Sequence, residues 1–370
     1  GAGGEGSARG APWFEVQQAR QVLLTGAGSV EELLKVLNPA AIGDFTYVNL
    51  STAFHRLAKL AAAEGGTTGD GYAPPRIVSS AAFLALEERL GQLRPGRLPA
   101  RNAANIMWAF GRLRHAPPPD LWARLEVSFV GDSARASPQN LSNALWACAV
   151  LGVRPSEALL TCAVEVARET GANFEARNVS IVVWALAKIL GPGAHVDPAL
   201  SGMLDELQVQ ATGLLVSFSA QNLANMAWGL GVLGHELLPE LAEVLRSRLG
   251  TAGFVEDTFT PQNVANLLWG LAKAPGGAVA VRGELLLGVF AEYIERNSAA
   301  LNAQNVSDLL FAFSALGSEG GVLESVQRSS AVKTLGTAYT RLRGKMQPGF
   351  AADGLEGLSI LGLEHLCYAA

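Results

Sequence analysis

The residues of this 370-residue chain that are best suited to chemistry are asparagines, aromatic residues and arginines that recur along it. Asparagine amides can hydrogen-bond the edges of nucleotide bases, and the planar arginine guanidinium pairs with phosphate and stacks on bases. In contrast, no Ser, His and Asp set and no Cys and His set has a local arrangement that would activate a nucleophile. The residue types therefore favour binding, and we predict a protein that is not an enzyme.

Metal and cofactor sites find little support in the sequence. The three cysteines and five histidines are scattered, which disfavours a zinc site, and the sparse, odd number of cysteines is typical of a reducing compartment. The glycine-rich segments 22–28 and 65–71 lack, respectively, the third glycine and the lysine of known phosphate-binding loops. We expect no metal, no cofactor and no small-molecule substrate.

An internal repeat organises most of the chain. Six similar segments share an aromatic anchor, and the anchors are separated by 38, 38, 44, 41 and 42 residues. The anchors are Trp108, Trp146, Trp184, Trp228, Trp269 and Phe311. A motif at such a period is typical of a solenoid, in which each repeat buries its apolar surface against its neighbours.

Each repeat is predicted to contain two helices. The anchor lies in the second, named helix B, which is preceded by a segment with apolar residues at i, i+3, i+4 and i+7, named helix A. Helices A are predicted at 120–130, 156–169, 198–211, 236–249 and 284–296. Helix B is apolar nearly all round after its first turn, which predicts an inner layer buried on every side. Motifs such as Ser137-Pro138-Gln139-Asn140 are typical of a helix N-terminus.

These patterns predict an all-α fold, an α-solenoid in which helical hairpins of about 38–44 residues form a right-handed superhelix. Degenerate repeats flank the clear ones, with Phe54 and Glu356 aligned at the anchor position. The predicted parts are an N-terminal extension with one helix (1–44) and a solenoid (45–364) with a degenerate repeat (45–62), a linker and helix (63–94), six clear repeats (95–317) and a degenerate cap (318–364).

The repeated polar and aromatic residues have a structural and a functional interpretation. One asparagine set lies at the start of helix B and a second lies one turn later: Asn102, Asn140, Asn178, Asn222, Asn263 and Asn305, then Asn105, Asn143, Asn225 and Asn266. They could contact base edges, but their constancy between repeats favours capping and inter-repeat hydrogen bonds, since a sequence reader should vary. We expect the tryptophans to belong to the core.

Charge is unevenly distributed along the chain. The net charge is -5, which excludes an unrestricted electrostatic attraction of the whole chain to a polyanion. Residues 89–155 hold nine basic and three acidic residues, and 325–370 hold five and three, whereas 156–324 hold 8 and 18. We therefore predict that any RNA is contacted mainly through two positive ends. Their candidate residues are Arg89, Arg94, Arg97, Arg101, Arg112 and Arg114, and then Arg341, Arg343 and Lys345.

A second set of candidate cations lies four residues after the anchor. Arg112, Lys188 and Lys273 occupy this position, and other repeats carry apolar residues there. Variation at one repeat position is how modular proteins distinguish targets. The alternative, which we favour, is that a cation near a helix C-terminus complements the helix dipole.

The repeat resembles the octotricopeptide repeat. The resemblance rests on residues 113–125 (LRHAPPPDLWARL) and 137–152 (SPQNLSNALWACAVLG), and it covers about 45–363. It implies an α-solenoid that binds RNA in mitochondria or chloroplasts. The sequence departs from the pattern at Ile181, where other repeats have Asn, and at Asp308 and Phe311.

From this resemblance and the modest basicity, we expect an accessory mitochondrial ribosomal protein that holds ribosomal RNA beside other proteins. Two alternatives stay open: a mitochondrial or chloroplast factor for one transcript, and a protein–protein scaffold without RNA. The longest near-apolar run, 179–190, is about half of what spans a bilayer, so no membrane association is expected.

Overall fold

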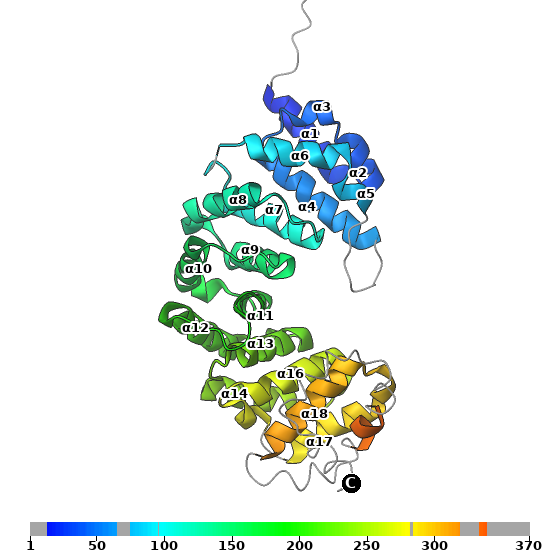
Figure 1. Cartoon of the computed structure of the whole chain (residues 1–370), viewed down its shortest axis with the longest axis vertical. Helices are drawn as coiled ribbons and strands as arrows, with labels where there is room; N and C mark the ends of the chain where they lie inside the picture. Colours follow the sequence, from blue (N-terminus) through cyan, green and yellow to red (C-terminus); the bar gives the residue numbers. More distant parts are fainter. Residues whose placement is uncertain (1–12, 65–74, 95, 282–283, 319–332, 339–370) are drawn as a thin grey trace, which may run out of the picture. The chain divides into compact units, whose positions relative to one another are not determined.

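The computed structural model describes residues 13–64, 75–94, 96–281, 284–318 and 333–338. These residues form α-helices and short 3-10 helices, and no strand occurs among them (Figure 1). The predicted all-α class is therefore confirmed. The chain forms two compact units, Gly1–Ala163 and Val164–Ala370.

The first unit begins with three helices, and the prediction of a single helix in 1–44 was wrong. It contains α1 (Trp13–Gly26), α2 (Val30–Val36), α3 (Pro39–Ile42), α4 (Tyr47–Glu64), α5 (Pro75–Val78), α6 (Ala81–Gln92), α7 (Ala100–Arg112), α8 (Pro119–Gly131) and α9 (Pro138–Leu151). Helix α10 (Glu157–Thr170) spans the boundary between the units. Helices α4, α7 and α9 contact one another in succession, and α8 packs on both α6 and α7 (Figure 1).

The second unit repeats this arrangement. It contains α11 (Ala176–Leu190), α12 (Pro198–Leu214), α13 (Ala220–Leu233), α14 (Pro239–Leu249), α15 (Phe254–Thr258), α16 (Pro261–Lys273), α17 (Glu284–Arg296) and α18 (Ala303–Ser318). Helices α11, α13, α16 and α18 contact one another in succession and carry the anchors, so they are helices B together with α7 and α9. Helices A are α8, α10, α12, α14 and α17. Short 3-10 helices join several helices A to the next helix B, as at Ser133–Arg135 and Leu215–Ser217.

Asparagine caps fix where helices B begin. In α9 the Asn140 backbone N–H donates to Ser137 Oγ at 3.3 Å, and the Asn140 Oδ1 accepts from the Ser137 backbone N–H at 3.1 Å. Thr260 and Asn263 make the same pair of bonds at the start of α16. Each pair satisfies backbone donors that the first helical turn leaves without partners.

Small residues bring successive helices B unusually close. A Cβ atom at Gly270 of α16 would lie 2.3 Å from the backbone of Ala227 in α13, a distance that no real side chain tolerates. A Cβ at Gly231 of α13 would likewise lie 2.6 Å from the Gly270 carbonyl oxygen. Glycine is therefore required at this seam, and the close approach decides where the larger neighbouring side chains can go.

The degenerate first repeat has a different register from the one we predicted. Thr46 and Asn49 form its N-terminal capping bonds, as Ser137 and Asn140 do in α9. Counting from these caps places His55 at the anchor, and its ring lies 5.1 Å from that of Trp108. Phe54 is instead fully buried. Residues 65–74 of the predicted linker and helix (63–94) and most of the predicted cap at 318–364, including Glu356, lie outside the described residues.

Candidate nucleic-acid interface

One face of every helix B is partly exposed. The residue three before the anchor and the anchor itself lie on this face, and the two residues between them are buried. We name this face, with the residue four after the anchor, the B stripe. Its members are Thr52, His55 and Lys59 of α4, the helix B of the degenerate first repeat; Asn105, Trp108 and Arg112; Asn143, Trp146 and Val150; Ile181, Trp184 and Lys188; Asn225, Trp228 and Val232; Asn266, Trp269 and Lys273; and Asp308, Phe311 and Ala315. Val232 is the one member that is buried.

The tryptophans of the B stripe, which we predicted to be core residues, lie at the edge of the core and are not fully buried. Each of the five anchors Trp108, Trp146, Trp184, Trp228 and Trp269 is partly exposed. Trp146 shows the reason, because a Cβ at Gly111 of the preceding helix B would lie 2.9 Å from its Cζ3 atom. The ring lies against Gly111, in the space that a side chain there would fill, and keeps part of its surface in solvent.

Neighbouring anchors form ladders of rings within each unit. In the first unit the ring centroids of Trp108 and Trp146 are 6.4 Å apart. In the second unit Trp269 lies 6.4 Å from both Trp228 and Phe311. These separations are those of aromatic rings already in contact, so a nucleotide base would lie along the exposed ring edges and not between two rings.

The cations four residues after the anchor reach the next repeat. Lys188 Nζ lies 4.9 Å from the ring centroid of Trp228, and Lys273 Nζ lies 4.5 Å from that of Phe311. Both lysines are exposed. They therefore make cation–π contacts within the B stripe, a role that neither of the two interpretations from sequence included.

Charge is separated between helices A and helices B. The six helices B α7, α9, α11, α13, α16 and α18 contain five basic residues and one acidic residue, Asp308. Helices A contain five basic and twelve acidic residues. Of the 18 acidic residues in the acidic middle of the sequence (156–324), ten lie on helices A and one lies on a helix B. Repulsion of a polyanion from the B stripe is correspondingly weaker than the net charge implies.

The arginines predicted from 89–114 do not form one patch. Arg94, Arg97 and Arg101 lie at the start of α7, whereas Arg112 and Arg114 lie at its end, so the two groups are separated by roughly 16 Å along the helix. All five are exposed.

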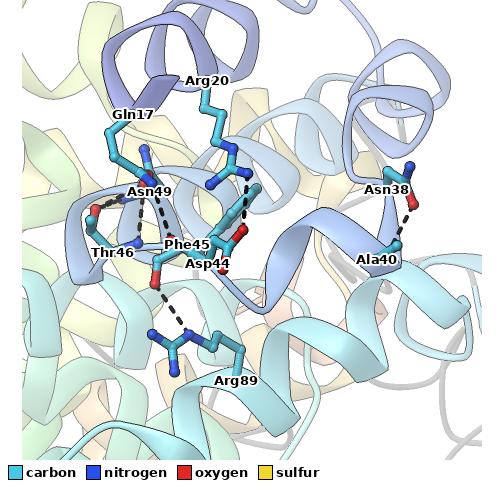
Figure 2. A network of polar contacts seen from close by, with 9 residues as sticks. All are labelled: Gln17, Arg20, Asn38, Ala40, Asp44, Phe45, Thr46, Asn49 and Arg89. Carbon is cyan, nitrogen blue, oxygen red and sulfur yellow. Dashed lines mark hydrogen bonds and ion pairs between the residues drawn. The ribbon is translucent and has the colours of Figure 1, made fainter. Parts of the chain in front are cut away.

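Arg89 is engaged in the fold. Its Nε donates to the carbonyl oxygen of Phe45 at 3.2 Å, within the polar network where α1 meets the start of α4 (Figure 2). In the same network Gln17 Nε2 donates to the Asp44 carbonyl at 3.2 Å. Arg89 therefore holds two segments of the first unit together. The other predicted cluster, Arg341, Arg343 and Lys345, lies outside the described residues.

The two asparagine sets have different roles. Members of the first set, such as Asn140 and Asn305, cap helices B and are buried. The second set, Asn105, Asn143, Asn225 and Asn266, lies beside the anchors on the B stripe. The spacing of three residues between this asparagine and the anchor places both on one helix face, and this signal was available in the sequence.

Other chemistry is limited in the described part of the chain. It holds no group of three or more His, Cys, Asp or Glu side chains that could bind a metal ion. Burial raises the pKa of the Cys148 thiol far above its usual value. Burial also lowers the pKa of His55, with Lys59 and Arg56 adding to the effect. None of the described helices has the length and apolar character needed to cross a membrane.

Comparison with family models and with curated proteins gave no match to this chain. The resemblance to the octotricopeptide repeat therefore stays a prediction based on the repeated motif.

Proposed function

We propose that this protein is a non-catalytic RNA-binding repeat protein that holds single-stranded RNA along the B-stripe residues of each unit. The observation that carries the proposal is the partly exposed ladder of anchors, flanked by amides and cations, on helices whose acidic residues are Glu64 of α4 and Asp308 of α18. RNA bases expose their edges in single strands, whereas the deep groove of double-stranded RNA hides them.

Each part of the B stripe has a role in this proposal. The cations at Lys59, Arg112, Lys188 and Lys273 contact phosphates, since they are exposed and distributed over both units. The amides contact base edges, and the ring edges of the anchors provide an apolar surface for the bases. This assignment replaces the two positive ends of the sequence as the main expected contact.

We extend the proposal to the larger setting. The successive contacts between helices B in each unit support the predicted α-solenoid. Its right-handed form stays part of the proposal. The resemblance of the repeat supports an organelle, with a mitochondrial ribosome as the first candidate. Crosslinking in the native organelle followed by RNA sequencing separates ribosomal RNA from one transcript, and sedimentation with the ribosome tests the assembly.

A protein–protein scaffold remains the second candidate function because of helices A. They are acidic, and they expose Val127 and Val209, which are 55% and 60% exposed. A basic, amphipathic protein partner fits this surface. The two candidates are compatible, since they use different helices.

The test compares charge removal on the two sets of helices in the full chain. One variant carries Lys59→Gln, Arg112→Gln, Lys188→Gln and Lys273→Gln. The control carries Arg154→Gln, Arg168→Gln, Arg246→Gln and Arg296→Gln, which change the net charge equally at exposed positions away from helices B. Binding of a fluorescent, random-sequence 20-nucleotide RNA is measured by anisotropy between 50 and 300 mM salt.

We expect the dependence of log Kd on log salt to fall by about 2.8 in the first variant, because each phosphate contact to single-stranded RNA contributes about 0.7. The control should keep most of the wild-type slope. The proposal would be contradicted if the slope fell equally in both variants, or if the wild-type chain bound no RNA.

A further inference from the structure

A chain of side-chain hydrogen bonds connects the last two described repeats. It begins at the Asn302 backbone N–H, which donates to Asn305 Oδ1 at 3.3 Å. Asn305 Nδ2 then donates to Gln262 Oε1 at 2.9 Å, and Gln262 Nε2 donates to Asn266 Oδ1 at 2.7 Å. Because a backbone N–H can only donate, it fixes which end of each following amide is oxygen and which is nitrogen.

The end of this chain decides what Asn266 presents to a ligand. Its Oδ1 is occupied by Gln262, and its Nδ2 has no hydrogen-bond partner among the residues the structure describes. Asn266 is partly exposed and lies on the B stripe, three residues before Trp269. It therefore offers a hydrogen-bond donor at the place where the proposed RNA passes.

The next repeat contains the same glutamine hydrogen bond, but the side chain that accepts it is left with a free acceptor instead of a free donor. Gln304 Nε2 donates to Asp308 Oδ1 at 2.7 Å, as Gln262 does to Asn266. The second oxygen of Asp308 has no hydrogen-bond partner within the described ranges. Burial raises the pKa of Asp308 to about 6, which leaves most of its carboxyl ionised at neutral pH. Asp308 is partly exposed, so this position offers an acceptor.

We propose that these two positions select bases with opposite hydrogen-bonding edges: Asp308 binds guanine through its N1–H and N2–H groups, and Asn266 binds a base with an acceptor-bearing edge. The inference rests on the proposed function. Guanine is the base whose Watson–Crick edge carries two adjacent donors, which match the free oxygen of Asp308 and a second lone pair of the oxygen that Gln304 contacts. The other bases place an acceptor beside their donor, and that acceptor would face the carboxylate charge.

Base selection from a random pool tests the inference without depending on total affinity. The full chain is incubated with random-sequence 20-nucleotide RNA, and the bound fraction is sequenced. The variants are Asp308→Asn, which keeps an oxygen for Gln304, and the double exchange Asn266→Asp with Asp308→Asn, which leaves the net charge unchanged. Asp120→Asn, at an exposed position on helix α8, is the control for loss of one negative charge.

We expect the wild-type chain to enrich guanine about fivefold or more at one position of the bound RNA, the lower limit for a well-made contact to a base edge. Asp308→Asn should lose this enrichment and Asp120→Asn should keep it. The double exchange should move the guanine to the neighbouring site.

Two results overturn the inference alone: RNA binding by the wild-type chain without guanine enrichment, or enrichment that Asp308→Asn and the double exchange leave in place. Failure of the wild-type chain to retain any RNA would overturn the proposed function as well, and the pool assay distinguishes this case directly.

Discussion

Helices A and helices B alternate along the chain, yet they have opposite surfaces. Helices B are nearly free of acidic residues and expose amides and ring edges, whereas helices A carry twelve acidic residues and isolated exposed valines. Charge averaged along the sequence therefore hides a separation of charge between layers. Helices B, which pack closely on one another, also present the amides and the anchor rings.

The tight packing of helices B predicts the largest effect on stability. Gly270→Ala places a Cβ 2.3 Å from the backbone of Ala227 and should lower the free energy of unfolding by about 3 kcal/mol, because backbone cannot move aside as a side chain can. In the matched variant Gly202→Ala on α12, the new Cβ meets nothing within 4 Å, so this variant should raise the free energy of unfolding by about 0.5–1 kcal/mol. Urea denaturation measures both, and similar effects would contradict the difference in packing.

A smaller loss of stability is expected when a side chain that connects a helix A to the next repeat is removed. Gln208 of α12 is fully buried, donates to the Glu236 carbonyl at 2.9 Å and accepts from the Leu238 backbone N–H at 2.9 Å. Gln208→Ala should cost about 2 kcal/mol, because two buried backbone groups lose their partners. Gln210→Ala, two residues further along and partly exposed, should stay within about 0.5 kcal/mol in the same denaturation experiment.

The acidic residue of helices B should affect stability in a pH-dependent way. Because the pKa of Asp308 is raised to about 6 in the folded chain, the wild-type protein should lose stability as the pH rises from about 4 to 6. Asp308→Asn should therefore be more stable than wild type above pH 6, by roughly 1 kcal/mol given partial exposure, and equally stable below pH 4. Thermal unfolding across this pH range measures the difference. A constant advantage at every pH would exclude titration of Asp308 as its cause.

The smallest effect concerns the cation–π contacts of the B stripe. Lys273→Gln removes a charge 4.5 Å from the Phe311 ring and should lower the free energy of unfolding by about 0.5 kcal/mol. Arg154→Gln, at an exposed position, is the matched control and should be neutral. Equal stabilities of the two variants would leave Lys273 with a role in ligand binding alone.

Much of the helix pattern could be predicted from sequence. The motif at 137–140 predicts the start of α9, which begins at Pro138, because capping depends on residues close in sequence. The helix A predicted at 284–296 has the same bounds as α17. The register of the first repeat was wrong by one residue, since Phe54 matches the anchor in residue type, whereas the cap at Asn49 identifies His55.

The candidate site was less accessible to sequence reasoning. The apolar composition of helix B predicts burial on all sides, but the anchor rings lie at the edge of the core, as Trp146 does against Gly111, and stay partly exposed. The roles of Lys188 and Lys273 also depend on the next repeat, which lies about 40 residues away in the sequence. Contacts between residues so far apart leave no local pattern.

The sequence by itself determined the helices, their caps and the repeat, because these follow from hydrogen bonds and apolar spacing within a few residues. Only the tertiary structure decided which side of each helix B faces solvent, how the charges divide between layers, and which atoms Asn266 and Asp308 present. Those outcomes depend on the distance between packed helices and on hydrogen bonds from one repeat to the next, such as that of Asn305 with Gln262.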